Sequence, residues 1–248
     1  MKNKIIALLN DIAVKENITI LYACESGSRA WGFPSTDSDY DVRFVYVRKQ
    51  NAYLNIRKTD DQLSYPITDD LDIYGWDLKK FLQLLHKSNC TPFEWLQSPV
   101  VYMKNDAFYI EVVAVLPTYF NDAQQLYHYK GIAYGSLKDA TIDTIGIKKL
   151  FYVIRPLLAA LWIVMYKQYP PMHMAGLLKP VSTDLKTTIN DLIAQKSIAG
   201  EKEVLTIDET IKAFISECFI TLDAARVTCK PNDITEPLNQ IFRKWITI

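Results

Sequence analysis

The pattern of hydrophobic and polar positions divides the chain into a first part of mixed strands and helices and a second part of helices. The runs 18–24 and 41–49 are short, β-branched and aromatic, and therefore predict two strands. Residues 70–76 alternate polar and apolar side chains, which predicts a third strand, and residues 100–103 predict a short edge strand. The polar stretch 53–69 predicts a long irregular loop.

Apolar residues at helical spacing predict three helices around these strands, over residues 2–14, 78–88 and 91–96. For the third of them, Thr91 is suited to the N-cap and Pro92 to the first helical position. Glu94 would complete a capping box with Thr91, so we interpret Glu94 as structural.

After residue 104 almost every segment has helical periodicity. The predicted helices cover residues 106–120, 123–141, 147–167, 184–198, 208–227 and 234–246. We therefore expect an α+β protein whose N-terminal part contains the sheet and whose C-terminal part is all-helical.

The composition is that of an ordinary globular protein of 248 residues, long enough to bury a large core. Lys plus Arg total 28 and Asp plus Glu also total 28, so the formal net charge is zero. Zero net charge argues against strong unspecific binding to long nucleic acid, because such binding needs many phosphate contacts. It leaves room for a local basic groove.

Cysteine usage and the apolar runs predict a soluble, cytoplasmic protein with no membrane partner. The cysteines form no C-x-x-C pair and have no histidine at metal-binding spacing; they are Cys24, Cys90, Cys218 and Cys229. We expect them to be reduced. The N-terminus has no signal-peptide core, and Arg155 and Pro156 interrupt the longest apolar run.

Two aspartates separated by one residue stand where the second strand begins. Side chains on a strand alternate between its faces, so Asp39 and Asp41 point the same way. Two carboxylates on one face repel each other. A divalent cation removes that cost, because Mg²⁺ takes oxygen ligands from carboxylates and substrate phosphates. The pair therefore indicates a magnesium site.

A Gly-Ser pair stands where the first strand ends, and it is suited to hold phosphates. Gly27 lets the backbone come close to a ligand, and Ser28 offers both an N–H and a hydroxyl. If Arg29 opens a short helix, the N–H groups at its N-terminus favour an anion. One site would then hold phosphate on one side and metal on the other.

This stretch resembles the nucleotidyltransferase superfamily built on the DNA polymerase beta fold, whose signature is Gly-Ser or Gly-Gly, a short gap and Asp-x-Asp. Gly-Ser-Arg-Ala-Trp-Gly at 27–32 and Ser-Asp-Tyr-Asp at 38–41 are similar to predicted nucleotidyltransferases of bacterial RNA-repair gene clusters. The resemblance implies a mixed β-sheet with flanking helices in a nucleotidyltransferase domain at 1–104. It also implies a helical C-terminal domain at 105–248.

The resemblance requires a third carboxylate on a neighbouring strand. Asp72 is our first choice, because apolar residues flank it and it leads into the centre of the predicted strand. Asp70 is the alternative. Asp77 is better suited to cap the helix that follows.

The predicted helix 147–167 carries cations on a mostly apolar surface, and the resemblance extends to its Lys-Lys, aromatic pair and Arg-Pro-Leu-Leu. Lys149, Tyr152 and Arg155 are candidates to contact a triphosphate, whose charge needs offsetting beyond the metal. Salt bridges to the catalytic half are the alternative. Pro156 would kink or break the helix.

We therefore expect metal-dependent transfer of a nucleoside monophosphate from an NTP to an acceptor hydroxyl, with Mg²⁺ or Mn²⁺ at Asp39, Asp41 and Asp72. Two such ions about 4 Å apart would hold the attacking and leaving oxygens. An RNA end is the acceptor that the family association implies. Protein side chains or small molecules are alternatives, and so is a non-catalytic nucleotide-sensing module. The sequence predicts neither the base preference nor the oligomeric state.

Overall fold

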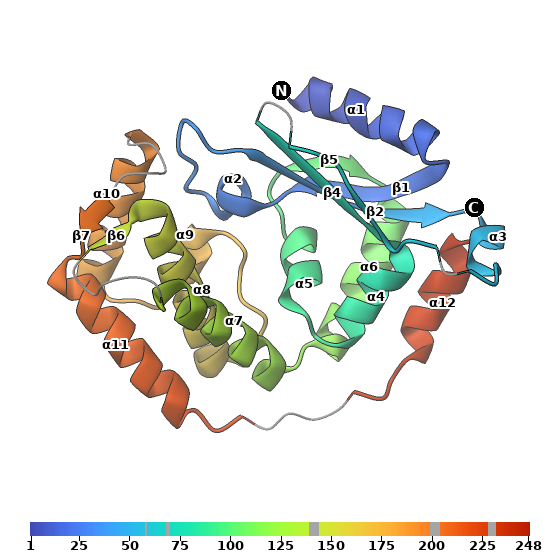
Figure 1. The fold of residues 1–248 in the computed structure, drawn as a ribbon. Helices are drawn as coiled ribbons and strands as arrows, with labels where there is room; N and C mark the ends of the chain where they lie inside the picture. Colours follow the sequence, from blue (N-terminus) through green and yellow to red (C-terminus); the bar gives the residue numbers. More distant parts are fainter. Residues whose placement is uncertain (58, 68–69, 139–143, 199–203, 228–231) are drawn as a thin grey trace. The chain divides into compact units, whose positions relative to one another are not determined.

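The computed structural model describes residues 1–248 except 58, 68–69, 139–143, 199–203 and 228–231 (Figure 1). The chain forms two compact units, and each is described by itself. The first comprises Met1–Gly27, Asp39–Tyr119 and Pro231–Ile248, and the second comprises Ser28–Ser38 and Phe120–Lys230. The chain therefore leaves the first unit after Gly27 and returns to it at Asp39. The division into independent domains at 104 stays a prediction.

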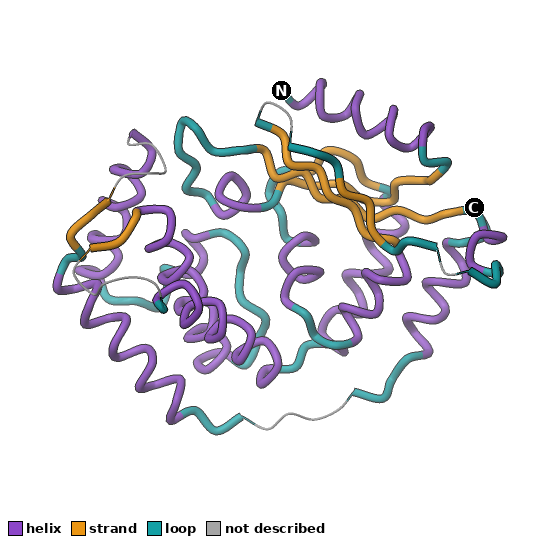
Figure 2. The backbone as a smooth tube through the Cα atoms, in the orientation of Figure 1, coloured by secondary structure: helices purple, strands orange, loops and turns teal. Residues whose placement is uncertain are grey.

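The first unit is built on a five-stranded mixed sheet of order β3-β4-β2-β1-β5 (Figure 2). Its strands are β1 (Ile18–Glu25), β2 (Tyr40–Arg48), β3 (Gln62–Ser64), β4 (Leu71–Asp77) and β5 (Val101–Lys104). Strands β2 and β4 run parallel, and the other neighbours run antiparallel. The predicted mixed sheet is confirmed.

Helices cover both faces of this sheet (Figure 1). On one face, α1 (Lys2–Lys15) buries Ile5 and Leu9 in a core with Phe44 and Ile73. These side chains alternate with polar ones along β2 and β4, as expected of strands whose two faces differ.

The opposite face packs against α4 (Leu78–His86), α5 (Cys90–Leu96) and α6 (Asp106–Tyr119). Trp76 of β4 stacks on Trp95 of α5, with ring centroids 4.1 Å apart. A final helix, α12 (Glu236–Trp245), completes the first unit, and its Trp245 packs edge-on against Phe108 of α6 at 5.5 Å.

Two details of the first unit differ from the sequence predictions. The stretch 53–69 is not wholly irregular, because β3 pairs with β4; a strand of three residues is too short to show a pattern. A short helix, α3 (Gln50–Tyr53), precedes it. Positions 58, 68 and 69 of the stretch 53–69 lie outside the described residues, whereas the predicted third strand, 70–76, is described throughout.

The predicted capping box of α5 is wrong. The helix begins at Cys90, and Asn89 is the N-cap, because its side chain accepts a hydrogen bond from the Thr91 N–H at 2.9 Å. Asparagine is as good an N-cap as threonine, and here it comes first in the chain. The prediction that Asp77 caps the helix after it is confirmed for α4, because the Asp77 side chain accepts a hydrogen bond from the Lys79 N–H at 2.8 Å.

The second unit is helical apart from one antiparallel pair, β6 (Thr144–Gly146) with β7 (Val204–Thr206). Its helices are α2 (Gly27–Trp31), α7 (Asp122–Leu137), α8 (Ile147–Tyr166), α9 (Met174–Leu177), α10 (Thr183–Ile198) and α11 (Glu209–Ala224). Gly27, the first residue of α2, belongs to the first unit. Helix α8 is buried along most of its length and continues through Pro156, where a kink or a break was predicted.

The other predicted strands and helices agree with the structure where it describes the chain. The predicted strands and helices all appear, with ends displaced by a few residues; positions 139–141 of the helix predicted at 123–141 lie outside the described residues. Cys24, Cys90 and Cys218 are free and buried, and Cys229 lies outside the described residues. Among the described helices, none is long and apolar enough to cross a membrane.

Candidate active site

Two of the predicted carboxylates lie directly opposite each other on parallel strands. Asp41 of β2 pairs in register with Asp72 of β4. Val42 and Ile73, the next residues along, are buried toward α1, so the two aspartates point to the other face of the sheet. The structure thus brings Asp41 and Asp72 together.

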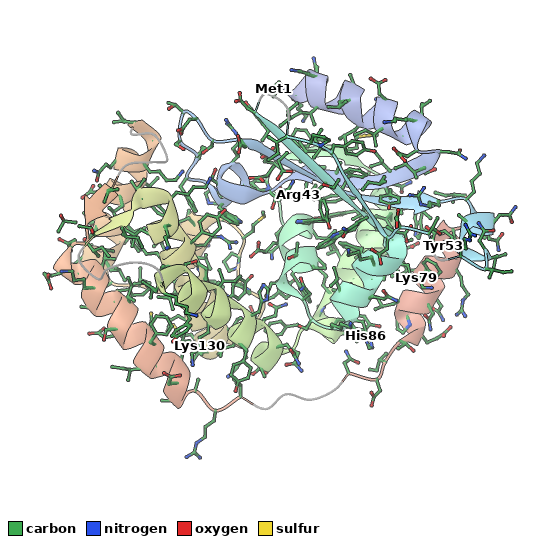
Figure 3. All side chains as sticks on the ribbon, in the orientation of Figure 1. Met1, Arg43, Tyr53, Lys79, His86 and Lys130 are labelled. Atoms are coloured by element: carbon green, nitrogen blue, oxygen red, sulfur yellow. The ribbon has the colours of Figure 1, made fainter. Side chains whose placement is uncertain are left out.

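A guanidinium group joins these two carboxylates; it belongs to Arg43, which is labelled in Figure 3. Arg43 follows Asp41 on the same face of β2, and its Nη2 donates at 2.7 Å both to Asp41 Oδ1 and to Asp72 Oδ2. Its Nη1 donates to the Asp72 carbonyl oxygen at 2.9 Å. The three side chains are partly shielded from water, which strengthens their attraction. Sequence analysis did not include Arg43 in the site.

Gly27 places the turn after β1 against the Asp41 carboxylate. Its φ is +58°, and a Cβ at this position would lie 1.9 Å from Asp41 Oδ2. Only glycine fits such an approach with a left-handed backbone. The Ser26 N–H donates to the Asp41 carbonyl at 2.8 Å and fixes the turn beside the strand.

A buried glutamate at the end of β1 holds the backbone of Asp41 by a hydrogen bond. Glu25 is 1% exposed, and its Oε1 accepts a hydrogen bond from the Asp41 N–H at 2.7 Å. Tyr102 of β5 donates its hydroxyl to Glu25 Oε2. The sequence signal for this role is an acidic residue at the end of an apolar strand, immediately before the Gly-Ser turn.

The cysteine beside this glutamate is not a nucleophile. Burial, and next the nearby Glu25 carboxylate, raise the pKa of the Cys24 thiol well above its ordinary value. Because the thiolate is the reactive form, Cys24 is inert at neutral pH.

Asp39 and Asp70 lie at the edge of this arrangement. Asp39 is exposed and precedes β2, two residues before Asp41. Asp70 is exposed and precedes β4, and its carbonyl oxygen accepts from the Tyr40 N–H at 2.6 Å. Asp70 therefore borders the strand pair through its backbone.

Residues 28–38 of the signature belong to the second unit, where they hold one another in place. The Ser28 hydroxyl donates to Ser38 Oγ at 3.1 Å, and Arg29 Nη2 donates to the Ser38 carbonyl at 2.7 Å. Both candidate phosphate ligands are thus tied to Ser38, the residue directly before Asp39.

Helix α8 contacts the same stretch through Trp31. The Arg155 guanidinium lies 4.4 Å from the centroid of the Trp31 ring, and the Tyr152 ring meets it edge-on at 5.7 Å. Arg155 is 4% exposed and donates from Nη2 to the Met172 carbonyl at 3.1 Å. Tyr152 is 40% exposed, and Lys149 on the same helix is half-buried.

A lysine that the sequence did not single out anchors this stretch from α10. Lys196 is 1% exposed, and its Nζ donates to the Phe33 carbonyl at 3.1 Å and to Ser35 Oγ at 3.2 Å. The Ser35 and Ser38 hydroxyls are 2.8 Å apart. A lysine within a helical pattern gives no signal that it will be buried.

The carboxylates supply the hard oxygen donors that Mg²⁺ prefers. No cluster of three or more His, Cys, Asp or Glu side chains within the described part of the chain is arranged to hold a metal ion. Instead Arg43 contacts one oxygen of Asp41 and one of Asp72. The donor chemistry fits a divalent cation, and Arg43 would compete with that cation for the same carboxylates.

A mixed sheet with a Gly-Ser turn against an Asp-x-Asp strand, and a further aspartate in register on the parallel neighbour, defines a polymerase beta-like nucleotidyltransferase. The comparison with protein families agrees. The chain belongs to the RlaP family, described as the RNA repair pathway DNA polymerase beta family, whose profile matches residues 1–244.

The chain is also 38% identical over 247 residues to the uncharacterized protein YcgL of Bacillus subtilis (strain 168). That match covers 98% of this chain and 95% of the relative. A solved structure of a nucleotidyltransferase-like protein from Exiguobacterium sibiricum 255-15 matches with a TM-score of 0.34 and 9% identity. It covers 99% of this chain and 79% of that one.

Proposed function

We propose that this protein transfers a nucleoside monophosphate from an NTP to the hydroxyl of an RNA end. The observation that carries the proposal is the Asp41–Asp72 pair, in register on parallel strands with the Gly27 turn against Asp41, in a member of an RNA repair nucleotidyltransferase family.

Asp39, Asp41 and Asp72 would hold Mg²⁺, for which Mn²⁺ is a substitute. When bound, the metal supplies positive charge to the phosphates and lowers the pKa of a bound hydroxyl. Asp72 also accepts the proton of the acceptor hydroxyl as general base. Arg43 keeps the two carboxylates oriented until substrate and cation arrive.

Gly27, Ser28 and Arg29 bind the β- and γ-phosphates in this proposal. Gly27 lets the backbone approach, Ser28 offers its N–H and hydroxyl, and Arg29 offsets charge on the leaving group. Lys149 and Tyr152 contribute from α8. Arg155 is buried under Trp31 and acts by holding α2.

The reaction is a single displacement at the α-phosphorus of the NTP. The acceptor oxygen forms a bond to the α-phosphorus while the bond from that phosphorus to the pyrophosphate oxygen breaks. The hydroxyl proton passes to Asp72, and pyrophosphate leaves with the electron pair.

The test is incubation with each of four α-labelled NTPs, Mg²⁺ or Mn²⁺, and short RNA, pooled RNA or cell lysate as acceptor. We expect label on RNA with the wild type, and a loss of at least about 100-fold in Asp41→Asn and in Asp72→Asn, as is typical when a charged catalytic group is removed. Asp70→Asn is the matched control, because Asp70 precedes Asp72 by two residues and is exposed. Label on protein, or equal activity in Asp72→Asn, would contradict the proposal.

A further inference from the structure

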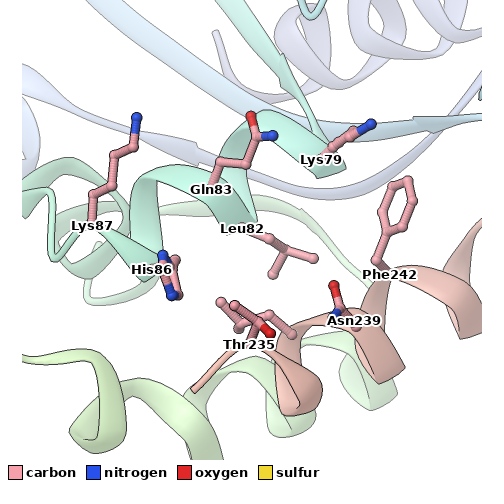
Figure 4. A pocket seen from close by; sticks show the side chains of 9 residues that line it. Lys79, Leu82, Gln83, His86, Lys87, Thr235, Asn239 and Phe242 are labelled. Carbon is pink, nitrogen blue, oxygen red and sulfur yellow. The ribbon is translucent and has the colours of Figure 1, made fainter. Parts of the chain in front are cut away.

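A cavity of about 320 Å³ lies in the first unit, between α4 and α12 (Figure 4). Lys79 and Lys87 stand at the two ends of its α4 wall, and His86 points across it toward α12. Among the described residues that line the cavity, none is acidic. In a protein of zero net charge, this local excess of positive charge favours an anion.

The rest of the lining suits a base and its sugar. Leu82 and Leu238 are buried and form an apolar floor. Phe242 of α12 offers an aromatic ring at the Lys79 end, and Asn239 an amide that both donates and accepts (Figure 4). Aromatic rings stack on bases of any identity.

A buried polar atom in the wall lacks a partner. His86 Nε2 is shielded from water and has no hydrogen-bond partner within the described part of the chain. Buried polar groups are nearly always hydrogen-bonded in native proteins, so a ligand or water is expected there. The volume is in the range of sites that hold small ligands.

We propose that this cavity binds a phosphate-bearing nucleotide, with its base against Phe242 and its phosphate toward Lys87, while Lys79 adds positive charge at the other end. The nucleotide is either free or one unit of an RNA strand. The RNA form rests on the proposed function and adds that the acceptor is bound at a second place, away from its reacting end.

The position of the cavity sets a minimum length for such a strand. Lys79 follows the C-terminal end of β4, whereas Asp72 lies at its start. Asp77 lies five residues after Asp72 on β4, which corresponds to about 17 Å at the usual rise of a β-strand. An RNA strand that reaches from Asp72 to the cavity therefore needs about five stacked nucleotides at about 3.4 Å each.

The experiment measures binding of the full chain to a labelled twelve-nucleotide single-stranded RNA by fluorescence anisotropy, with neither NTP nor divalent metal present. We expect Lys79→Ala/Lys87→Ala to bind about tenfold more weakly. The slope of log affinity against log salt should fall in magnitude by about 1.4, or about 0.7 for each lost phosphate contact. Lys79→Arg/Lys87→Arg should keep both values.

Lys2→Ala/Lys15→Ala is the matched control, because it removes the same charge from exposed positions of α1 in the same unit. Equal weakening by the control, or no weakening by the cavity variant, would overturn the proposal. So would the absence of binding by the wild type to both RNA and ribonucleoside monophosphates.

Competition experiments with ribonucleoside monophosphates and with a trinucleotide distinguish a free nucleotide from one unit of an RNA strand. Competition by monophosphates at the concentration where the twelve-mer is bound supports a free nucleotide, and preference for the longer RNA supports a strand. The binding measurement contains neither NTP nor divalent metal, so it does not depend on transfer. RNA binding by the wild type without label transfer would therefore reject the proposed function and keep this one.

Discussion

The contact of one guanidinium with two carboxylates makes Arg43 the residue on which the charge of the candidate site depends. Asp41 and Asp72 would repel each other in register on neighbouring strands, and Arg43 offsets that repulsion. A divalent cation would offset it in the same way. Arg43 and the cation therefore stabilise the same pair of side chains and compete for it.

The Arg43→Gln substitution should make the thermal stability of the protein depend on the divalent cation. Without metal, we expect the thermal midpoint to fall, because two ionised carboxylates lose their positive partner. With Mn²⁺, we expect a larger rise in the midpoint than in the wild type, because binding to the native state stabilises by mass action. Calorimetric titration with Mn²⁺ should show several-fold tighter binding. Weaker binding than the wild type would contradict this competition.

Replacing Gly27→Ala should remove function and stability together. The new methyl group would overlap Asp41 Oδ2, and a left-handed backbone costs a non-glycine residue about 1–2 kcal/mol before that clash is counted. We expect a loss of more than about 2 kcal/mol in urea unfolding, with loss of NTP binding.

Gly131→Ala is the matched control for that substitution. Gly131 lies inside α7, and a Cβ there meets nothing within 4 Å. Alanine in a helix interior should stabilise by about 0.5–1 kcal/mol. If the two variants were equally stable, the close approach at Gly27 would not be the cause.

At the scale of elements, the junction of β4 with α4 links the sheet to the wall of the cavity. Asp77 ends the strand and caps the helix, and Tyr53 donates its hydroxyl to Asp77 Oδ2 at 2.7 Å. Burial raises the pKa of Asp77, although the hydrogen bonds from Tyr53 and the Lys79 N–H lower it. The capping charge is therefore held in an unfavourable environment.

The pKa shift at Asp77 has a definite sign in the stability of the protein. The folded state binds the Asp77 carboxyl proton more tightly than the unfolded state. The contribution of this proton to the free energy of unfolding is therefore present at low pH and is lost as pH rises through the folded-state pKa. Asp77→Asn keeps the capping oxygen and removes the charge. The stability of the variant relative to the wild type should increase between pH 4 and pH 7, measured by urea unfolding. A constant difference would contradict this sign.

At the scale of the whole molecule, the signature motif is divided between the two units. Gly27 and Asp39 belong to the first unit, and the residues between them belong to the helical second unit. Within that unit, Lys196 holds the stretch through Phe33 and Ser35. Folding of the helical unit is therefore expected to order Ser28 and Arg29, the candidate phosphate-binding residues of that unit.

Replacing Lys196→Met should loosen this stretch. It removes the Lys196 donor from the buried Phe33 carbonyl and the Ser35 hydroxyl. The loss should lower the free energy of unfolding by about 1–3 kcal/mol for each group left without a partner. We expect faster proteolysis within 28–38 and weaker NTP binding by calorimetry. Lys186→Met on the same helix is the control, and its stability should change by less than about 0.5 kcal/mol. Equal effects of both variants would reject an anchoring role.

Much of the site was open to prediction because strand geometry is local. Alternation predicted the strand around Asp72, which β4 confirms, and it predicted Asp39 and Asp41 on one face, although Asp39 precedes β2 and lies outside the strand. Helix caps were less certain, since Asn89 and Thr91 are both good caps and only the path of the chain chose between them. Strand β3 was missed because three residues carry too little pattern.

Residues close together in the chain were enough to predict the longer strands and helices and the Gly-Ser turn, and the resemblance of the signature stretch indicated the family. Three contacts became visible only in the folded chain: Arg43 joins Asp41 and Asp72, Glu25 supports Asp41, and Lys196 is buried against residues 33–35. These contacts join residues up to 163 positions apart, and packing alone decides which polar groups lose their water and must find one another.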